Sequence, residues 1–341
     1  MSCSRRLIGA LPPLAGLALV ASFLAIPAAR ADIVPLSAMM HGITMTQTQC
    51  AELAQAVWIT PAGKGFCMRY YLSVAGGAGS HPVVMLQGDQ LGRFDARTGR
   101  FEPAPNAPTE DTDTDNLVKL ADILSRRFGG PAIYLARVGI DGSSGHHGIR
   151  HSFLELYATN QALDAIKQRY AFKGFSLIGQ SGGATLVGGL LALRTDIGCA
   201  VPGSGNLALL NGYKSANSLA AAFDPAAMIP AIAKKSTARI LVVTDPRDKI
   251  VPVDHQSTFV SQLRRAGGTA EQLFVEATDE SHHGVSLYAV YATAACLRGQ
   301  TDEEIATGLA TFVEKRVAAV RAKAERDATM HNPSESAAPR S

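Results

Sequence analysis

The stretch Phe175-Ser-Leu-Ile-Gly-Gln-Ser181-Gly-Gly-Ala-Thr-Leu-Val-Gly-Gly-Leu-Leu-Ala-Leu-Arg194 decides the fold. It begins as a short apolar run typical of a buried strand, passes through Gly179-Gln180-Ser181-Gly182-Gly183, and continues with helical composition. A sharp strand-to-helix turn lifts a serine hydroxyl clear of the sheet, where a neighbouring base can remove its proton. The stretch therefore predicts a nucleophile elbow with Ser181 as the nucleophile.

The residues around Ser181 fit this interpretation. Gly179 and Gly183 leave room where the strand and helix backbones approach, and the N–H of Gly182 would face negative charge that develops in a reaction. One alternative is a plain glycine-rich turn. Another is a phosphate-binding loop, which needs Gly-Lys-Ser/Thr, but Gly183 is followed by Ala184-Thr185-Leu186 with no lysine. Nucleotide binding is therefore disfavoured.

The two ends of the chain differ from its middle. Residues 1–31 carry Arg5-Arg6, an apolar run, and Ala29-Arg30-Ala31, which is typical of a cleaved export signal. The run is long enough for a membrane anchor, but Pro12-Pro13 interrupts it. We expect export to the periplasm or the extracellular space, with no membrane attachment after cleavage. Residues 32–325 are expected to form a single domain, and residues 326–341 a disordered tail.

The composition fits one large domain without a nucleic-acid partner. Hydrophobic residues make up 47% of the chain and charged residues 18%, which is ample for a large core. Three of the 32 basic residues lie in residues 1–31. The other 29 equal the 29 acidic residues in number, so the formal net charge of residues 32–341 is zero. No run of Lys and Arg with interleaved aromatic residues is present, as nucleic-acid binding would favour.

Four cysteines follow residue 31, namely Cys50, Cys67, Cys199 and Cys296. An even number suits an oxidising compartment, and three pairings are possible. We favour Cys50 with Cys67, which flank a local turn, and Cys199 with Cys296, which lie in core elements. Buried free thiols are the alternative. Since no Cys-x-x-Cys pair occurs, a metal or redox motif is not indicated.

Short apolar runs alternate with amphipathic segments along the chain. The expected strands are His81–Leu86, Ala132–Val138, Phe175–Ile178, Cys199–Val201, Arg239–Val243 and Gln272–Val275. The expected helices are Asn116–Phe128, Phe153–Tyr170, Ala184–Leu193, Gln256–Arg265 and Ser286–Leu297. Ala56–Thr60 and Phe66–Ser73 are expected to form an antiparallel hairpin at the start of the sheet. This alternation predicts an α/β protein with a doubly wound, mostly parallel sheet.

With the elbow at this place in the alternation, the chain resembles the α/β-hydrolase superfamily, and within it the secreted hydrolases related to prolyl oligopeptidase and dienelactone hydrolase. The resemblance covers roughly Val57 to Val320. It implies antiparallel N-terminal strands and a short insertion, Pro202–Ser236, before the strand that precedes the catalytic acid. It also implies a triad in the order serine, aspartate, histidine, each residue following a strand.

The acid is expected after the strand Arg239–Val243. Thr244-Asp245-Pro246-Arg247-Asp248-Lys249-Ile250-Val251-Pro252 offers two carboxylates there. The Asp-x-x-Val-Pro setting of Asp248 resembles the acid loop of the superfamily, in which the carboxylate orients the imidazole. Asp248 is therefore our choice. Asp245 is the reserve, and its alternative role is a turn residue ahead of Pro246.

The base is expected after the last strand, where Thr278-Asp279-Glu280-Ser281-His282-His283-Gly284-Val285-Ser286 contains adjacent histidines. In similar enzymes a small residue and the final helix follow the working imidazole. We therefore choose His283, with His282 in reserve. The other histidine would be an exposed loop residue or a supporting group.

The resemblance also implies an oxyanion hole made of two backbone N–H groups. Gly182 supplies the first, and the second would come from Met85-Leu86-Gln87-Gly88-Asp89-Gln90, where the superfamily usually has His-Gly-x. The N–H of Asp89 is the expected donor. A carboxylate beside a forming oxyanion raises the barrier unless it turns away or is paired, so substrate contact by Asp89 or donation by Gln90 remain alternatives.

A histidine-rich segment, Arg137-Val-Gly-Ile-Asp-Gly-Ser-Ser-Gly-His146-His147-Gly-Ile-Arg-His151, follows a strand on the same edge. It predicts a structural loop or a substrate rim that includes His146 and His147. No His-x-x-x-His pair with a glutamate is present, and a serine mechanism needs neither metal nor cofactor.

These features predict a secreted serine hydrolase that cleaves carboxylic esters through an acyl-enzyme. The expected substrate is a small-molecule or short peptide acyl compound. A prolyl-oligopeptidase-like serine peptidase is the first alternative, and a non-catalytic binding protein on a hydrolase fold is the second. The sequence does not indicate the oligomeric state.

Overall fold

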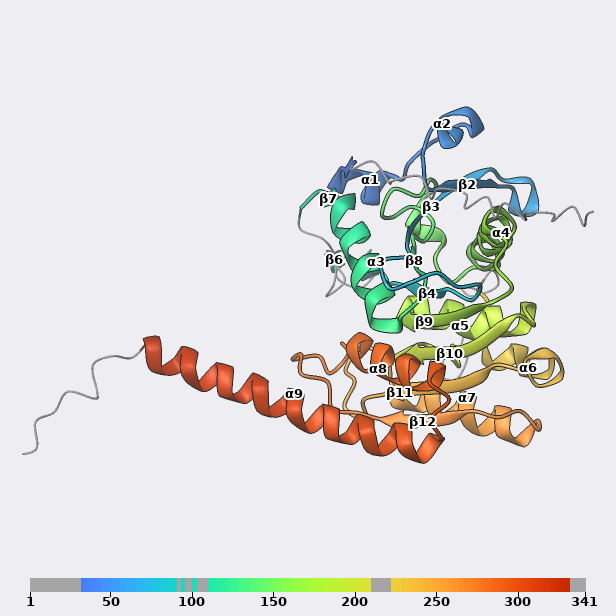
Figure 1. Cartoon of the computed structure of the whole chain (residues 1–341). Helices are drawn as coiled ribbons and strands as arrows, with labels where there is room; N and C mark the ends of the chain where they lie inside the picture. Colours follow the sequence, from blue (N-terminus) through green and yellow to red (C-terminus); the bar gives the residue numbers. More distant parts are fainter. Residues whose placement is uncertain (1–31, 91–92, 96–99, 103–109, 210–221, 332–341) are drawn as a thin grey trace, which may run out of the picture.

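The expected apolar runs form the strands of one central sheet. The computed structural model describes residues 32–90, 93–95, 100–102, 110–209 and 222–331. Eight strands pair in the order β12-β11-β10-β9-β4-β8-β3-β2 (Figure 1). Their bounds are β2 (Ala56–Ile59), β3 (Phe66–Ser73), β4 (Val83–Leu86), β8 (Ala132–Leu135), β9 (Phe175–Gln180), β10 (Ile197–Gly203), β11 (Arg239–Thr244) and β12 (Glu271–Phe274).

The direction of the strands matches the predicted class. From β8 to β12 along the sheet the pairs are parallel, whereas β3 runs antiparallel to both β8 and β2. The central strands β4 and β8 are apolar and buried along their whole length, because parallel sheets are covered on both faces. The doubly wound, mostly parallel sheet with antiparallel N-terminal strands is thus confirmed.

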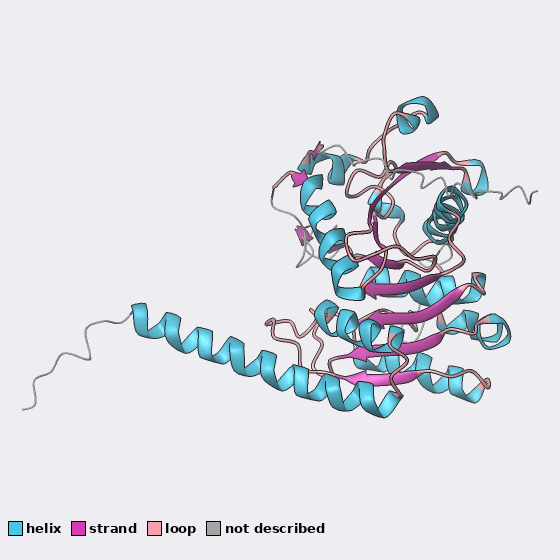
Figure 2. Ribbon diagram, in the orientation of Figure 1, coloured by secondary structure: helices cyan, strands magenta, loops and turns pink. Residues whose placement is uncertain are grey.

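Helices cover both faces of this sheet (Figures 1 and 2). One face packs against α4 (Phe153–Tyr170), α5 (Gly182–Leu193), α6 (Ile229–Lys235) and α7 (Val253–Arg265). The other packs against α3 (Thr114–Phe128), α8 (Ser286–Leu297) and the first turns of α9 (Asp302–His331). Successive residues of β4 alternate between the two cores, with Val84 and Leu86 on one side and Val83 and Met85 on the other.

Smaller elements surround this frame. They are β1 (Ile33–Val34), which pairs with β7 (Thr112–Asp113), the hairpin β5 (Arg93–Asp95) and β6 (Arg100–Glu102), α1 (Leu36–His41), α2 (Gln47–Ala51), and the single turns η1 (Pro61–Gly63), η2 (His147–Ile149) and η4 (Ala226–Met228). The predicted insertion before β11 contains η4 and α6, and its residues 210–221 lie outside the described residues.

The C-terminal helix corrects one expectation. α9 continues to His331, so residues 326–331 are helical and not part of a disordered tail. The preceding residues 318–326 are rich in Ala, Glu, Lys and Arg, which favour helix even where no apolar periodicity remains. Residues 332–341 and the predicted signal, residues 1–31, lie outside the described residues. Among the helices that the structure describes, none has the length and apolar composition to span a membrane.

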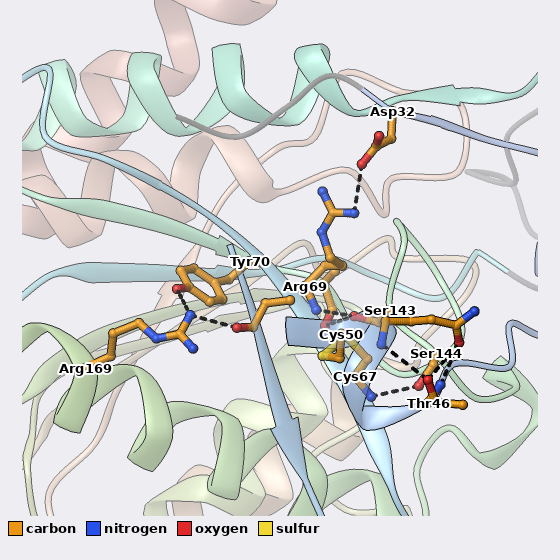
Figure 3. Close-up of a disulfide and its surroundings, with 12 residues drawn as sticks. Asp32, Thr46, Cys50, Cys67, Arg69, Tyr70, Ser143, Ser144 and Arg169 are labelled. Atoms are coloured by element: carbon orange, nitrogen blue, oxygen red, sulfur yellow. Dashed lines mark hydrogen bonds and ion pairs between the residues drawn. A yellow bond between two sulfur atoms is a disulfide. The ribbon is translucent and has the colours of Figure 1, made fainter. Parts of the chain in front are cut away.

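Both favoured disulfides are present. Cys50 pairs with Cys67, which joins α2 to β3, and Cys199 pairs with Cys296, which joins β10 to α8. Figure 3 shows the first of these beside the loop that follows β8. There Ser144 Oγ accepts a hydrogen bond from the N–H of Cys67 at 2.8 Å, and the N–H of Ser144 donates to the Cys67 carbonyl at 2.9 Å. The disulfide therefore anchors a strand that itself fixes the histidine-rich loop.

Candidate active site

Ser181 lies at the predicted turn between β9 and α5. Its backbone has φ 53° and ψ −119°, a conformation that is rare for any residue other than glycine. A Cβ on Gly179 would lie 2.5 Å from backbone atoms of Ala184, and one on Gly183 would lie 2.1 Å from the Leu86 carbonyl oxygen. Both positions need glycine for this close approach. The side chain of Ser181 is partly exposed, as a nucleophile requires.

His283 and Asp248 form a buried pair beyond β12 and β11. His283 Nδ1 lies 3.0 and 2.9 Å from the two carboxylate oxygens of Asp248, whose side chain is fully buried. Asp248 Oδ1 also accepts the N–H groups of Ile250 and Val251 at 2.8 and 2.9 Å. This arrangement places the imidazole hydrogen on Nδ1 and leaves Nε2 as a proton acceptor.

The reserve residues form a second pair beside the first. His282 Nδ1 lies 3.0 Å from Asp245 Oδ2. The buried Asp245 carboxylate also accepts the N–H of Ala277 at 2.7 Å and that of Arg247 at 2.8 Å. Asp245 therefore ties the end of β11 to the loop that carries both histidines.

The loop of His283 is bonded to the elbow through Gln180, the residue before Ser181. Gln180 Nε2 donates to the His283 carbonyl at 2.7 Å, and Ser286 Oγ donates to Gln180 Oε1 at 3.1 Å. The Ser181 hydroxyl and the His283 imidazole are not hydrogen-bonded in this structure; such contacts often tighten only when substrate binds. The structure thus joins Asp248 directly to His283 and joins the backbone of His283 to the elbow.

Asp279 also holds the histidine loop, and the sequence did not single it out. Its carboxylate accepts the N–H groups of His283 at 3.1 Å and Gly284 at 2.8 Å, as well as the Ser281 hydroxyl. Burial opposes ionisation, but these hydrogen bonds lower the pKa of Asp279 below its ordinary value. Asp279 and His283 line an open pocket of about 480 Å³ with Lys249, Ile250, Glu280, Ser281 and Gly284.

On the other side of the elbow, the Asp89 carboxylate packs directly on Gly182. A Cβ on Gly182 would lie 2.1 Å from Asp89 Oδ1. The carboxylate is paired, with Arg137 Nη1 at 2.7 Å from Oδ1 and His151 Nε2 at 2.7 Å from Oδ2. Burial alone would raise the pKa of Asp89, but the charges of His151 and Arg137 hold it well below its ordinary range. The sequence predicted that a carboxylate at residue 89 would repel a forming oxyanion unless it turned away or was paired. In the structure the Asp89 carboxylate is paired.

The side chain of Gln90 is engaged elsewhere. Gln90 Nε2 lies 3.2 and 3.1 Å from the carboxylate oxygens of the buried Asp141, which also accepts the Tyr134 hydroxyl at 2.6 Å. This leaves the backbone of Asp89 as the better candidate for the second donor.

The histidine-rich loop corrects the predicted substrate rim. His147 is fully buried, with Nδ1 3.0 Å from the Val138 carbonyl, so it does not reach a substrate. His146 accepts the Gly148 N–H through Nδ1 at 2.8 Å, and its Nε2 lies 3.0 Å from the Met40 carbonyl, so both ring nitrogens have partners within the protein. His151, which had no assigned role, is the histidine that reaches Asp89.

No protein-family model matches the sequence, and no curated protein matches it significantly. Solved structures do resemble the chain. The esterase Pf2001 of Pyrococcus furiosus matches with 14% identity and a TM-score of 0.51, over 76% of this chain and 96% of the esterase. The acylaminoacyl peptidase of Pyrococcus horikoshii matches with 12% identity and a TM-score of 0.48, over 68% of this chain.

The match covers only 38% of the length of the Pyrococcus horikoshii peptidase. A Klebsiella pneumoniae protein assigned as a dienelactone hydrolase matches with 18% identity and a TM-score of 0.44, over 74% of this chain and 93% of that protein. At these identities the likeness shows the fold, and the fold is that of the α/β hydrolases.

Proposed function

We propose that this chain, which has the α/β-hydrolase fold, is an exported serine hydrolase that cleaves carboxylic esters through Ser181, His283 and Asp248. The observation that carries the proposal is the buried His283–Asp248 pair, whose loop is bonded to Gln180 at the strained elbow. A histidine with no role beyond the surface would not need two contacts with the buried Asp248 carboxylate. It would also not need a hydrogen bond from its carbonyl to Gln180, the residue before Ser181 with its φ of 53°.

The proposed reaction begins with proton transfer from Ser181 Oγ to His283 Nε2. Oγ attacks the carbonyl carbon, and the carbonyl electrons move onto its oxygen. Collapse of this tetrahedral intermediate breaks the bond to the alkoxy group, which takes the proton from His283. Water then repeats the sequence on the acyl-enzyme and releases the acid. Asp248 stabilises the imidazolium in each half of the reaction.

The oxyanion would be held by the backbone N–H groups of Gly182 and Asp89. Gly182 opens α5, so its N–H has no partner within the helix. A Cβ on Gly88 would lie 3.1 Å from Ser181 Cβ, so the peptide unit that ends in the Asp89 N–H passes close to the nucleophile. Preorganised donors of this kind contribute about 10²- to 10³-fold each to kcat.

The proposed substrates are small-molecule or short peptide acyl compounds. The open pocket beside His283 is lined by both polar side chains and Ile250 but not by Ser181, so it would receive only the part of a substrate that extends along the histidine loop. An ester is favoured because an alkoxide is a better leaving group than the amide anion of a peptide, so ester cleavage depends less on proton donation by His283. Export is supported by the two disulfides, which persist in oxidising compartments.

The test is covalent labelling by an organophosphonate, read by mass spectrometry, together with turnover of a short nitrophenyl ester. The wild type should give one adduct on Ser181 and an initial burst of nitrophenol. Ser181→Ala should lose both. Ser261→Ala, which removes a similarly part-buried serine on α7, should behave as the wild type.

Two results would contradict the proposal in different ways. Lack of labelling and turnover in the oxidised wild type would favour a binding protein on this fold. Hydrolysis of a chromogenic proline amide as fast as the matching ester would favour a peptidase.

A further inference from the structure

Arg137 is a buried cation that the proposed mechanism does not yet use. It is 1% exposed and is the largest fully buried side chain of the described residues. It lies two residues after β8, within the apolar run Ala132–Val138, where a charge needs a partner. Its guanidinium lies against the elbow, because a Cβ on Gly182 would come within 2.6 Å of Nη1.

We infer that Arg137, clamped by Glu155, is the positioning residue that makes Asp89 usable in the oxyanion hole. The inference rests on the proposed function, since it concerns the same reaction. Arg137 does two things at once: it neutralises the carboxylate beside the forming oxyanion, and it fixes the peptide that carries the second donor.

One side of Arg137 is held by Glu155. Its Nε and Nη2 lie 2.9 and 2.8 Å from Oε1 of Glu155, which is itself fully buried. Glu155 Oε2 accepts the N–H of His151 at 2.7 Å. Glu155 sits in the first turn of α4, where Ser152 accepts its N–H. The anion that holds Arg137 is therefore fixed by a capped helix end.

The other side of Arg137 faces the oxyanion loop. Nη1 donates to Asp89 Oδ1 at 2.7 Å and to the Gln87 carbonyl at 3.2 Å. One nitrogen thus holds the chain on both sides of Gly88, where an added Cβ would lie 3.1 Å from Ser181 Cβ. The orientation of the Gly88–Asp89 peptide follows from this contact, and a displacement of about 1 Å at such a site costs about 100-fold in rate.

The second oxygen of Asp89 is held by the histidine-rich loop. His151 Nε2 lies 2.7 Å from Oδ2, and Arg150 Nε lies 3.4 Å from it. The carboxylate is therefore fixed at both oxygens and turned toward cations. A negative charge close to an oxyanion raises the barrier by Coulomb repulsion, and an adjacent guanidinium cancels most of this repulsion.

A structural ion pair would show the same contacts, so the test must separate the two roles. If Arg137 acts through Asp89, its removal harms catalysis less once Asp89 no longer carries a charge. If Arg137 only stabilises the fold, its removal costs the same in either background. A double-mutant cycle measures this difference.

The experiment compares Arg137→Met/Glu155→Gln with Arg137→Met/Glu155→Gln/Asp89→Asn. Removing Glu155 together with Arg137 avoids an unpaired buried charge. The first variant should lower kcat for a nitrophenyl ester about 100-fold with little change in KM, and it should weaken binding of a phenylboronate to a similar extent. In the Asp89→Asn background, the same two substitutions should lower kcat at least about tenfold less than they do in the wild type. The reference for that second comparison is Asp89→Asn alone.

Arg194→Met is the matched control. Arg194 is also a buried guanidinium, paired with Asp164 at 2.7 Å and Asp196 at 2.8 Å at the opposite end of α5. It should lower the unfolding midpoint while leaving kcat and boronate affinity as in the wild type. Arg137→Lys keeps the positive charge, but a single ammonium group cannot bond Glu155 and Asp89 at the same time as the guanidinium does. The kcat of this variant should therefore lie between that of the wild type and that of Arg137→Met/Glu155→Gln.

Equal loss of kcat with and without the Asp89 charge would overturn the inference, as would wild-type kcat in Arg137→Met/Glu155→Gln. In both cases the wild type still labels at Ser181, so the proposed function survives. A wild type that neither labels nor turns over overturns the proposed function and this inference together.

Discussion

At the scale of single residues, the neighbours of a buried carboxylate decide in which direction its pKa moves. Burial acts to raise the pKa of both Asp89 and Asp141. Asp89 meets cations and its pKa falls, whereas Asp141 meets the neutral donors Tyr134 and Gln90 and its pKa stays raised. His147 has no paired anion within hydrogen-bonding distance, and burial lowers its pKa to about 3.

The low pKa of His147 predicts a pH dependence of stability. In the unfolded chain an ordinary histidine takes up a proton as the pH falls through about 6.5, but folded His147 does so only near pH 3. Stability should therefore be fully present above pH 6.5 and be lost as the pH falls below it, by up to about 1.4 kcal/mol per pH unit. His147→Gln should remove this part of the slope in urea unfolding at pH 7, 5.5 and 4. Parallel slopes for both proteins would contradict the prediction.

At the scale of elements, the segment between β12 and α8 is held by three carboxylates. Asp245 binds its start at Ala277 and its middle at His282, Asp248 binds the His283 ring, and Asp279 binds the His283 backbone. Asp245 and Asp248 lie in the loop after β11, and Asp279 lies in the segment itself. Such multiple contacts preorganise an imidazole more firmly than a single triad bond.

The two aspartates after β11 should differ in mutational effect. Asp248→Asn should lower kcat about 10⁴-fold with little loss of stability, because it reverses the tautomer of His283. Asp245→Asn should lower kcat less than about tenfold but cost about 1–3 kcal/mol of unfolding free energy, since it leaves buried N–H groups poorly matched. Ester turnover and urea unfolding of both variants check this. The reverse order would make Asp245 and His282 the working pair.

The elements were predictable because their signals are local. α4 and α8 match the expected ranges Phe153–Tyr170 and Ser286–Leu297, since apolar periodicity and capping operate within one window of sequence. The disordered tail expected from residue 326 onward was wrong for residues 326–331, because helix propensity continued α9 after its apolar contacts ceased.

The ionic cluster at the elbow was not predictable in the same way. Asp89, Arg137 and Glu155 come from three elements that only the sheet order brings together. The one available signal was a charged residue ending an apolar strand run, which indicates a buried partner without identifying it. The triad candidates could be located in the sequence because each follows a strand at the same edge of the sheet.

At the scale of the molecule, the disulfides act on different lengths of chain. Cys50–Cys67 closes a sequence separation of 17 residues, and Cys199–Cys296 one of 97 residues. The second ties the middle of the sheet to the helix that follows the histidine loop. Its removal should therefore release more unfolded-state entropy and loosen the support of His283.

The expected losses follow from loop length. Replacing both cysteines of a pair by serine should cost about 3 kcal/mol for Cys50–Cys67 and about 4.7 kcal/mol for Cys199–Cys296 by the chain-entropy model. Calorimetry of the two double variants compares them directly. A larger loss for the Cys50–Cys67 variant would show that contacts with the histidine-rich loop outweigh loop entropy.

The length of α9 has a consequence for motion in solution. The helix contains 30 residues, which corresponds to about 45 Å, and its second half extends past the sheet (Figure 1). A particle of this outline tumbles faster about its long axis than across it. Small-angle scattering should accordingly give a pair-distance distribution with an extended tail, and a chain ending at Lys323 should shorten that tail while leaving the main peak in place.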